Sequence, residues 1–108
     1  MINVTINRNS SGRIDSFTMS GHAEYDDPGK DIVCAGASAI AFGAINSIYA
    51  LCKVEPILEQ EQSGFLRCQI PHIGDKAIEE KVQLLLEGML VSLQTIELDY
   101  GQYMKIQS

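Results

Sequence analysis

Residues 32–52, IVCAGASAIAFGAINSIYALC, contain no charged side chain. It is rich in alanine, glycine and serine, with one amide at Asn46. Its length would suffice to cross a membrane. Small side chains transfer weakly into lipid, however, and no basic flank fixes an orientation. We therefore predict a buried central helix whose small side chains let neighbouring elements approach closely, in a protein that does not enter a membrane.

Two strands are predicted ahead of this helix. Residues 2–7 alternate between apolar and polar side chains, which is the pattern of a half-buried strand. A turn at residues 9–12 leads to a second strand over residues 13–20. Residues 21–31 contain two glycines, one proline and four acidic side chains without periodicity, and we expect a loop there.

A hairpin is predicted after the central helix. Val54–Gln62 and Phe65–Ile70 flank Ser63-Gly64, which is typical of a two-residue turn. Pro56 indicates that the first of these strands lies at a sheet edge or begins late, because proline cannot donate to a ladder.

A second helix is predicted after Asp75, whose side chain can cap its first turn. We expect Glu80, Gln83 and Glu87 on its solvent side. Apolar side chains recur at three- and four-residue spacing on the other side. The predicted core positions of this helix are Ile78, Val82, Leu85, Leu86, Met89, Leu93 and Ile96.

The order of elements indicates the fold class. Gly101 ends the second helix, and residues 102–107 offer a final short strand. The resulting order, β-β-α-β-β-α-β, predicts an α+β fold with two helices on one face of a mainly antiparallel sheet. A chain of 108 residues is expected to form a single domain over residues 1–108.

Composition and charge exclude several classes of protein. A hydrophobic fraction of 45% is too high for a disordered chain. Eight basic residues against fourteen acidic ones argue against direct binding of nucleic acid, which needs clustered lysine and arginine. The net charge of −6 favours basic partners instead. The first residues have neither a basic nor an apolar signal region, so we expect a reduced, cytoplasmic protein.

Cys34 is the strongest candidate for chemistry. If Asp31 caps the central helix, Cys34 occupies its third position, where unpaired backbone N–H groups and the helix dipole favour a thiolate. The same amides could stabilise an oxyanion. The alternative interpretation of Cys34 is a small apolar residue packed at a helix start.

Three other residues could assist Cys34. His22 follows the second strand and could double back to act as a base, although a solvated loop histidine would look the same. Asp31 could cap the helix or orient His22. Ser38 lies one turn beyond Cys34 on the same helix face and could steady the site or hydrogen-bond within its own helix.

The remaining cysteines and histidine carry weaker signals. Cys52 and Cys68 are predicted to be structural. His72, in the loop before the second helix, is a fallback base. The three cysteines include no CxxC pair, and a zinc site would require a scattered set of ligands, so we expect no metal site. The sequence contains no glycine-rich phosphate loop, and we expect no cofactor.

One block of residues is more specific than any isolated histidine or cysteine: Gly21-His22-Ala23, followed by Gly29-x-Asp31-Ile32-Val33-Cys34-Ala35 and Ser38. In this block, in length and in the order of elements, the chain resembles the ribosomal-processing cysteine protease family, known as Prp. The resemblance implies a homodimeric cysteine endopeptidase that removes the N-terminal extension of large-subunit ribosomal protein number twenty-seven. It also implies Cys34 as nucleophile, His22 as base, Asp31 and Ser38 as supporting motif residues, and Gly21 and Gly29 as hinges of a loop over the site.

Three hypotheses of different classes follow. The first is this peptide-bond hydrolase. The second is a non-catalytic protein that binds a basic ribosomal-protein tail without cutting it. The third is a redox-sensing thiol, which ranks lowest because no resolving cysteine lies near Cys34 in the sequence.

Overall fold

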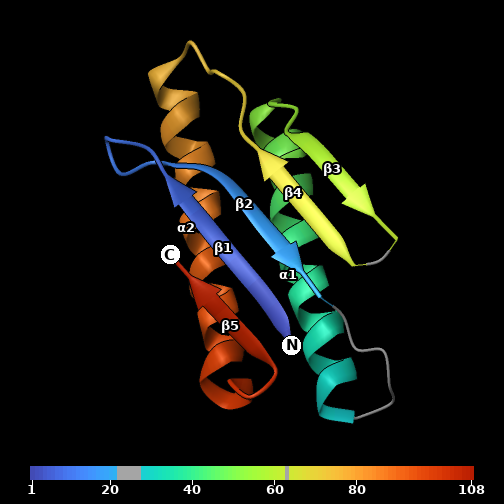
Figure 1. Ribbon diagram of the computed structural model, residues 1–108. Helices are drawn as coiled ribbons and strands as arrows, with labels where there is room; N and C mark the ends of the chain where they lie inside the picture. The colour runs from blue at the N-terminus through green and yellow to red at the C-terminus, as the bar shows by residue number, and fades with distance from the viewer. Residues whose placement is uncertain (22–27, 63) are drawn as a thin grey trace.

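The computed structural model describes residues 1–21, 28–62 and 64–108. Its elements follow the predicted order β-β-α-β-β-α-β (Figure 1). Their bounds are β1 Ile2–Arg8, β2 Ile14–Ser20, α1 Pro28–Cys52, β3 Ile57–Glu61, β4 Phe65–Gln69, α2 Lys76–Tyr100 and β5 Met104–Gln107.

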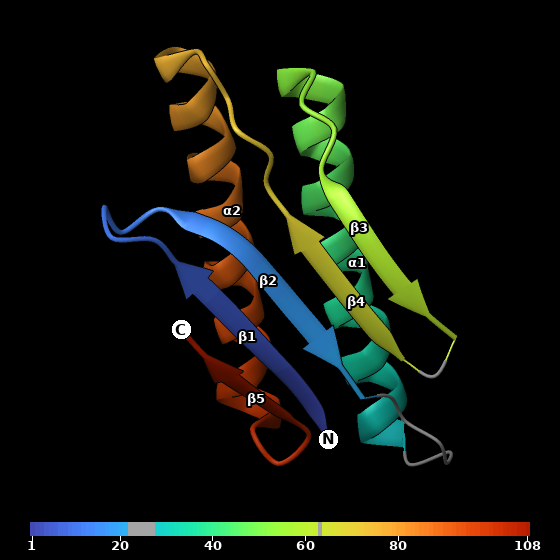
Figure 2. The same ribbon diagram turned by 45° about the horizontal axis from the view of Figure 1, so that its top comes forward.

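The strands form one sheet in the order β3-β4-β2-β1-β5. Neighbouring strands are antiparallel except β1 and β5, which are parallel. Both helices lie on the same face of this sheet and run in opposite directions (Figures 1 and 2). The prediction of an α+β fold with a mainly antiparallel sheet is confirmed.

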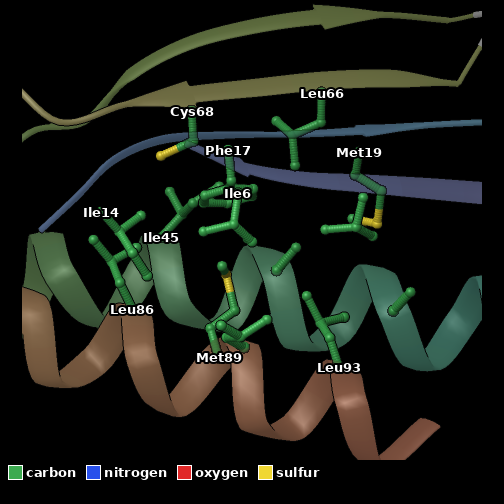
Figure 3. Close-up of a cluster of buried hydrophobic side chains, with 14 of the residues drawn as sticks. Ile6, Ile14, Phe17, Met19, Ile45, Leu66, Cys68, Leu86, Met89 and Leu93 are labelled. Atoms are coloured by element: carbon green, nitrogen blue, oxygen red, sulfur yellow. The ribbon is translucent and has the colours of Figure 1, made fainter. Parts of the chain in front are cut away.

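The core fills the space between the sheet and the helices. Alternate side chains of β1, Ile2, Val4 and Ile6, point towards the helices because successive side chains of a strand face opposite sides. Phe17 on β2 lies at the centre and is 1% exposed. Figure 3 shows strand side chains meeting those of both helices in one apolar layer.

The hairpin of β3 and β4 matches its prediction except at the turn. β3 begins after Pro56 and lies at the sheet edge, as the proline indicated. The last pair joins Glu61 to Phe65, so three residues rather than two connect the strands. Gly64 has φ +92° and donates its N–H to the Glu61 carbonyl oxygen at 3.1 Å. A glycine in the left-handed region is what such a three-residue loop requires.

The predicted apolar stripe of α2 is confirmed, but the prediction for its solvent side is partly wrong. Val82, Leu86, Met89 and Leu93 are buried, and so is Leu90, which was not predicted. The remaining predicted core positions, Ile78, Leu85 and Ile96, are half-buried and pack against the core.

Two of the three residues expected on the solvent side of α2 have partners on the sheet. Gln83 is half-buried, accepts the Ile14 N–H and donates to the Ile14 carbonyl oxygen, both at 2.8 Å. Glu87 forms a bidentate pair with Arg8, and that hydrogen bonding lowers the pKa of Glu87. Glu80 is exposed, as expected. The helix periodicity alone could not reveal these partners, because they come from distant strands.

The start of α1 differs from the prediction. The helix begins at Pro28, so residues 28–31 belong to the helix rather than to the loop. Proline suits the first helical position because it lacks the N–H that is unpaired there and its φ is already helical. The prediction of a loop was therefore wrong for residues 28–31.

The burial of α1 is one-sided. Ala37, Ala41, Ile45 and Ile48 face the sheet and are at most 4% exposed. A Cβ built on Gly36 would lie 3.2 Å from the Ile96 side chain, so the helices approach closely there, as the small side chains predicted. However, only 28% of the stretch 32–52 is buried, and its mean hydropathy of 1.6 would also suit a membrane span. The prediction of a buried central helix is therefore correct for one face only.

The cap of α2 gives a testable contribution to stability. The Asp75 side chain accepts the Ile78 N–H at 3.0 Å, as predicted. We expect Asp75→Ala to lower the free energy of unfolding by about 1 kcal/mol, because one N–H of the first turn loses its acceptor. Urea unfolding followed by circular dichroism measures the change. Asp75→Asn, which retains a capping oxygen, should lose much less, and equal losses would contradict the capping role.

Candidate active site

Cys34 lies in the second turn of α1 as its seventh residue. The position is later than predicted, because the helix starts three residues before Asp31. Asp31 is inside the first turn and does not cap the helix. The dipole acts mainly on the first turn, and only the first four N–H groups of a helix are unpaired. The amide of Cys34 therefore lies within the helical hydrogen-bond ladder and is not among the unpaired N–H groups of the first turn. The expectation that the amides of Cys34 or its neighbours form an oxyanion hole stays a prediction.

A pocket of about 230 Å³ opens beside Cys34. Cys34, Ser38 and Phe42 form its helix wall, since residues four apart lie on one face of a helix. Cys34 is half-buried and Ser38 is exposed. Cys34 and Ser38 therefore share one helix face, as their spacing indicated.

The other walls of the pocket come from the sheet. The start of β1 and the end of β2 contribute one wall, and the turn between β3 and β4 contributes another. These elements meet because β4 pairs with β2 in the sheet. The sheet residues that line the pocket are Ile2, Met19, Gly21, Gln60, Glu61, Gly64, Phe65 and Leu66.

Gly21 connects the wall formed by β1 and β2 with the wall formed by the β3–β4 turn. Its N–H donates to the Gly64 carbonyl oxygen at 2.9 Å, and its φ is +92°. A Cβ at this position would lie 2.2 Å from the Met1 carbonyl oxygen. Both the backbone conformation and the space therefore require glycine here.

Two predicted site residues cannot be placed in full. His22 lies outside the described residues. Asp31 is described only as a part of the α1 backbone. Gly29 lies in the first turn of α1, so the helix begins before the predicted end of the loop.

The pocket also contains residues that sequence reasoning missed. Phe42 lies eight residues beyond Cys34, so two helical turns along the Cys34–Ser38 face would have found it. The hairpin residues, Glu61 and Phe65 among them, carry no comparable signal. Their place at the pocket depends on the pairing of β4 with β2, which joins distant parts of the chain.

The remaining candidates lie away from this pocket. Cys52 is 7% exposed and Cys68 is fully buried, which agrees with their predicted structural roles. Burial raises the pKa of the Cys68 thiol to about 12. His72 is exposed in the loop before α2 and lines two other pockets, neither of which includes Cys34. Within the described ranges, no three His, Cys, Asp or Glu side chains are grouped to hold a metal ion.

Comparison with known proteins identifies the family. The family model described as "Cysteine protease Prp" matches residues 1–105. The chain belongs to this family. The Prp ribosomal processing cysteine protease of Bacillus subtilis (strain 168) is 43% identical over 107 residues, covering 98% of this chain and 96% of the relative. The chain is thus a cysteine protease by family.

Two solved Prp structures share the whole fold. The S. aureus protease in complex with a substrate peptide matches with a TM-score of 0.86 and 36% identity, covering 99% of this chain and 98% of that one. The S. aureus protease with a covalently linked product peptide matches with a TM-score of 0.83 and 35% identity, with the same coverage. The Prp fold therefore accommodates a peptide, and in that relative a peptide becomes covalently attached.

The three cysteines should differ in their reaction with iodoacetamide near neutral pH. We expect Cys34 to react first, because it lines an open pocket. Cys68 should react at least about 100-fold more slowly, because burial blocks access and its raised pKa leaves almost no thiolate. Timed quenching followed by peptide mass mapping measures the three rates. Denatured protein is the control, since all three thiols should then react alike. Equal rates for Cys34 and Cys68 in the folded protein would contradict the interpretation of Cys34 as the reactive cysteine.

Proposed function

We propose that this protein is a cysteine endopeptidase that removes the N-terminal extension of large-subunit ribosomal protein number twenty-seven. Cys34 is the nucleophile and His22 is the base. The observation that carries the proposal is the half-buried Cys34 beside Ser38 at an open pocket. The relatives from Bacillus subtilis and Staphylococcus aureus are ribosomal processing cysteine proteases, which supports the class of substrate.

The reaction has two steps. His22 takes the proton of the Cys34 thiol, and the thiolate attacks the scissile carbonyl carbon. The amide C–N bond then breaks, the leaving amine takes the proton from His22, and a thioester joins the N-terminal fragment to Cys34. Water next attacks the thioester with His22 as base, releasing a carboxylate and restoring the thiol. The covalently linked product peptide in the S. aureus structure is consistent with such a mechanism.

The position of Gly21 supports the role of His22. Gly21 lines the same pocket as Cys34, and His22 is the next residue in the chain. Asp31 and Ser38 are supporting residues in this proposal, and Gly21 directly precedes His22 in the chain.

The pocket and the charge of the chain suit an extended peptide with a basic continuation. Met19, Phe42, Phe65 and Leu66 offer apolar contacts for a substrate side chain. The net charge of −6 favours encounter with a basic ribosomal protein. We place the reaction in the cytoplasm, where thiols stay reduced and ribosomal proteins are made.

Incubation with the unprocessed ribosomal protein, followed by intact-mass measurement, tests the proposal. We expect one new pair of fragments whose masses add up to the precursor plus one water. A precursor with alanine on both sides of the cut should remain intact and serves as the control. The alternative, a non-catalytic binder of a basic tail, predicts a stable complex and no fragments from either precursor.

A further inference from the structure

Strand β3 is one of the two edges of the sheet, and no described element lies along its outer side (Figures 1 and 2). All of its residues are exposed, and Ile57 and Leu58 expose 51% and 41% of their surface. Edge strands are usually protected by lysine, by proline or by a covering segment, because their backbone groups can pair with another extended chain. Within its bounds, β3 contains neither lysine nor proline. This edge can therefore accept a further strand.

The pairing of β4 shows which backbone groups of β3 are turned outward. The N–H of Ile70, directly after β4, donates to the Asp15 carbonyl oxygen at 2.9 Å, so the even-numbered residues of this segment bond to β2. In an antiparallel sheet the residues between them bond to the strand on the other side, and their partners are the odd-numbered residues of β3. The N–H and C=O groups of Leu58 and Gln60 consequently point away from the sheet.

The other edge of the sheet, β5, is protected in two ways. The Ile106 N–H donates to the Glu97 side chain of α2 at 2.8 Å, so this backbone group already has an acceptor. The strand also contains a lysine, and no described residue of β5 lines the Cys34 pocket. Among the described residues, no side chain bonds in this way to the backbone of Leu58 or Gln60. The two edges therefore differ, and β3 is the one that offers backbone groups beside the pocket.

The outward backbone of β3 is continuous with the Cys34 pocket. Gln60 lines this pocket together with Cys34. Gln60 pairs with the buried Leu66, so its side chain lies on the helix side of the sheet, where the pocket opens. A peptide that leaves the pocket in an extended conformation meets the Gln60 backbone first and Leu58 about 7 Å further along the edge. Pro56 has no N–H to donate, so the edge ends there.

We propose that the peptide bound at the Cys34 pocket continues along β3 and pairs with the backbone of Leu58 and Gln60 as a sixth strand of the sheet. Main-chain hydrogen bonds provide the affinity in binding of this kind, and alternate side chains of the peptide lie on the two faces of the sheet. The occupant is the extended segment of the substrate next to the scissile bond, because the edge is continuous with the pocket. The inference rests on the proposed function for the identity of this peptide.

A scan of N-methylated peptides tests the pairing. A fluorescent peptide that spans the cut in the unprocessed ribosomal protein is mixed with the Cys34→Ala variant, and fluorescence anisotropy gives its Kd. Each peptide of the series carries one methyl group on one backbone nitrogen, which removes a donor and keeps the two strands apart. On one side of the cut, we expect Kd to rise at least about tenfold at two residues separated by one, and less than about threefold at the residue between them.

Leu58→Pro tests the same contact from the side of the protein. Proline removes an N–H that points outward, a change that edge strands tolerate, so circular dichroism should show a folded protein. We expect this variant to bind the unmodified peptide at least about tenfold more weakly. Leu58→Ala is the matched control, because it restores the N–H without the side chain, and it should keep the affinity to within about threefold. In Leu58→Pro, methylation of the facing peptide residue should lose most of its effect, since both changes remove one contact.

The binding measurement separates this inference from the proposed function. Cleavage of the unmodified peptide by the wild type tests the function, while the scan with Cys34→Ala reports on the pairing whether or not cleavage occurs. A scan without alternation on either side of the cut, or a peptide that does not bind, would overturn the inference. So would a folded Leu58→Pro variant that keeps the full affinity. If that variant instead changed only the sedimentation of the protein, the edge would belong to a second copy of the chain and not to the substrate.

Discussion

Cys34→Ala is expected to cleave the precursor at least about a thousandfold more slowly than the wild type, the scale on which a covalent nucleophile contributes. Alanine retains the helix and the pocket but provides no atom to attack the carbonyl carbon. The free energy of unfolding should stay within about 1 kcal/mol of the wild type, because Cys34 is only half-buried and the lost sulfur leaves little cavity. Progress curves by intact mass and urea unfolding measure the two quantities.

Cys68→Ala is the matched control for this result. Cys68 is fully buried between sheet and helices, so its sulfur contributes to packing (Figure 3). We expect this variant to lose about 1–2 kcal/mol of stability while the folded fraction keeps the wild-type rate. The two cysteines should thus separate chemistry from packing. A Cys34→Ala variant with a tenth or more of the wild-type rate would refute the nucleophile assignment.

Local patterns predicted most of the elements correctly. The cap at Asp75 and the apolar stripe of α2 are both properties of one short segment, and both are confirmed. Pro56 placed β3 correctly because its effect is also local. The start of α1 was missed because Pro28 and Gly29 favour loops in general, and only the first helical position makes proline favourable.

Contacts between distant segments could not be predicted in the same way. Gln83 was expected on the solvent side of α2, but it bonds both backbone groups of Ile14. The sequence contains no signal for this pairing, because a polar residue at this position of a helix is compatible both with exposure to solvent and with a hydrogen-bonded contact to a strand. Helix α1 shows the opposite error, because a segment that was predicted to be buried is exposed on one side. The absence of charge over residues 32–52 predicted burial, and the single chain satisfies that prediction on one side only.

The same distinction between local patterns and contacts of distant segments holds for the candidate site. Cys34 and Ser38 share a helix face, so their spacing sufficed to place them together. The hairpin wall of the pocket exists because β4 pairs with β2, and periodicity does not show which strands pair. Gly21 belongs to both groups: its motif position was recognised, while the reason for glycine lies in the Met1 carbonyl oxygen next to it.

Gly21→Ala should therefore have a larger effect than its size suggests. The added methyl group would meet the Met1 carbonyl oxygen at 2.2 Å, and the backbone has φ +92°. To avoid this clash, either the start of β1 or Gly21 itself must move. Moving Gly21 would disturb the hydrogen bond from its N–H to the Gly64 carbonyl oxygen. The start of β1 and Gly21 both form walls of the Cys34 pocket. We expect a loss of at least about 3 kcal/mol of stability, combining left-handed strain with the backbone clash.

Gly12→Ala separates these two causes. Gly12 has φ +84°, but a Cβ there would meet nothing within 4 Å. This variant should lose only the about 1–2 kcal/mol of left-handed strain and should cleave the precursor at the wild-type rate. Thermal unfolding and cleavage rates, measured at a temperature where both variants are folded, give the comparison. Because His22 follows Gly21 directly, the folded Gly21→Ala protein should also cleave more slowly than Gly12→Ala. Equal stability and equal rates in the two variants would mean that the Met1 contact does not constrain the pocket wall.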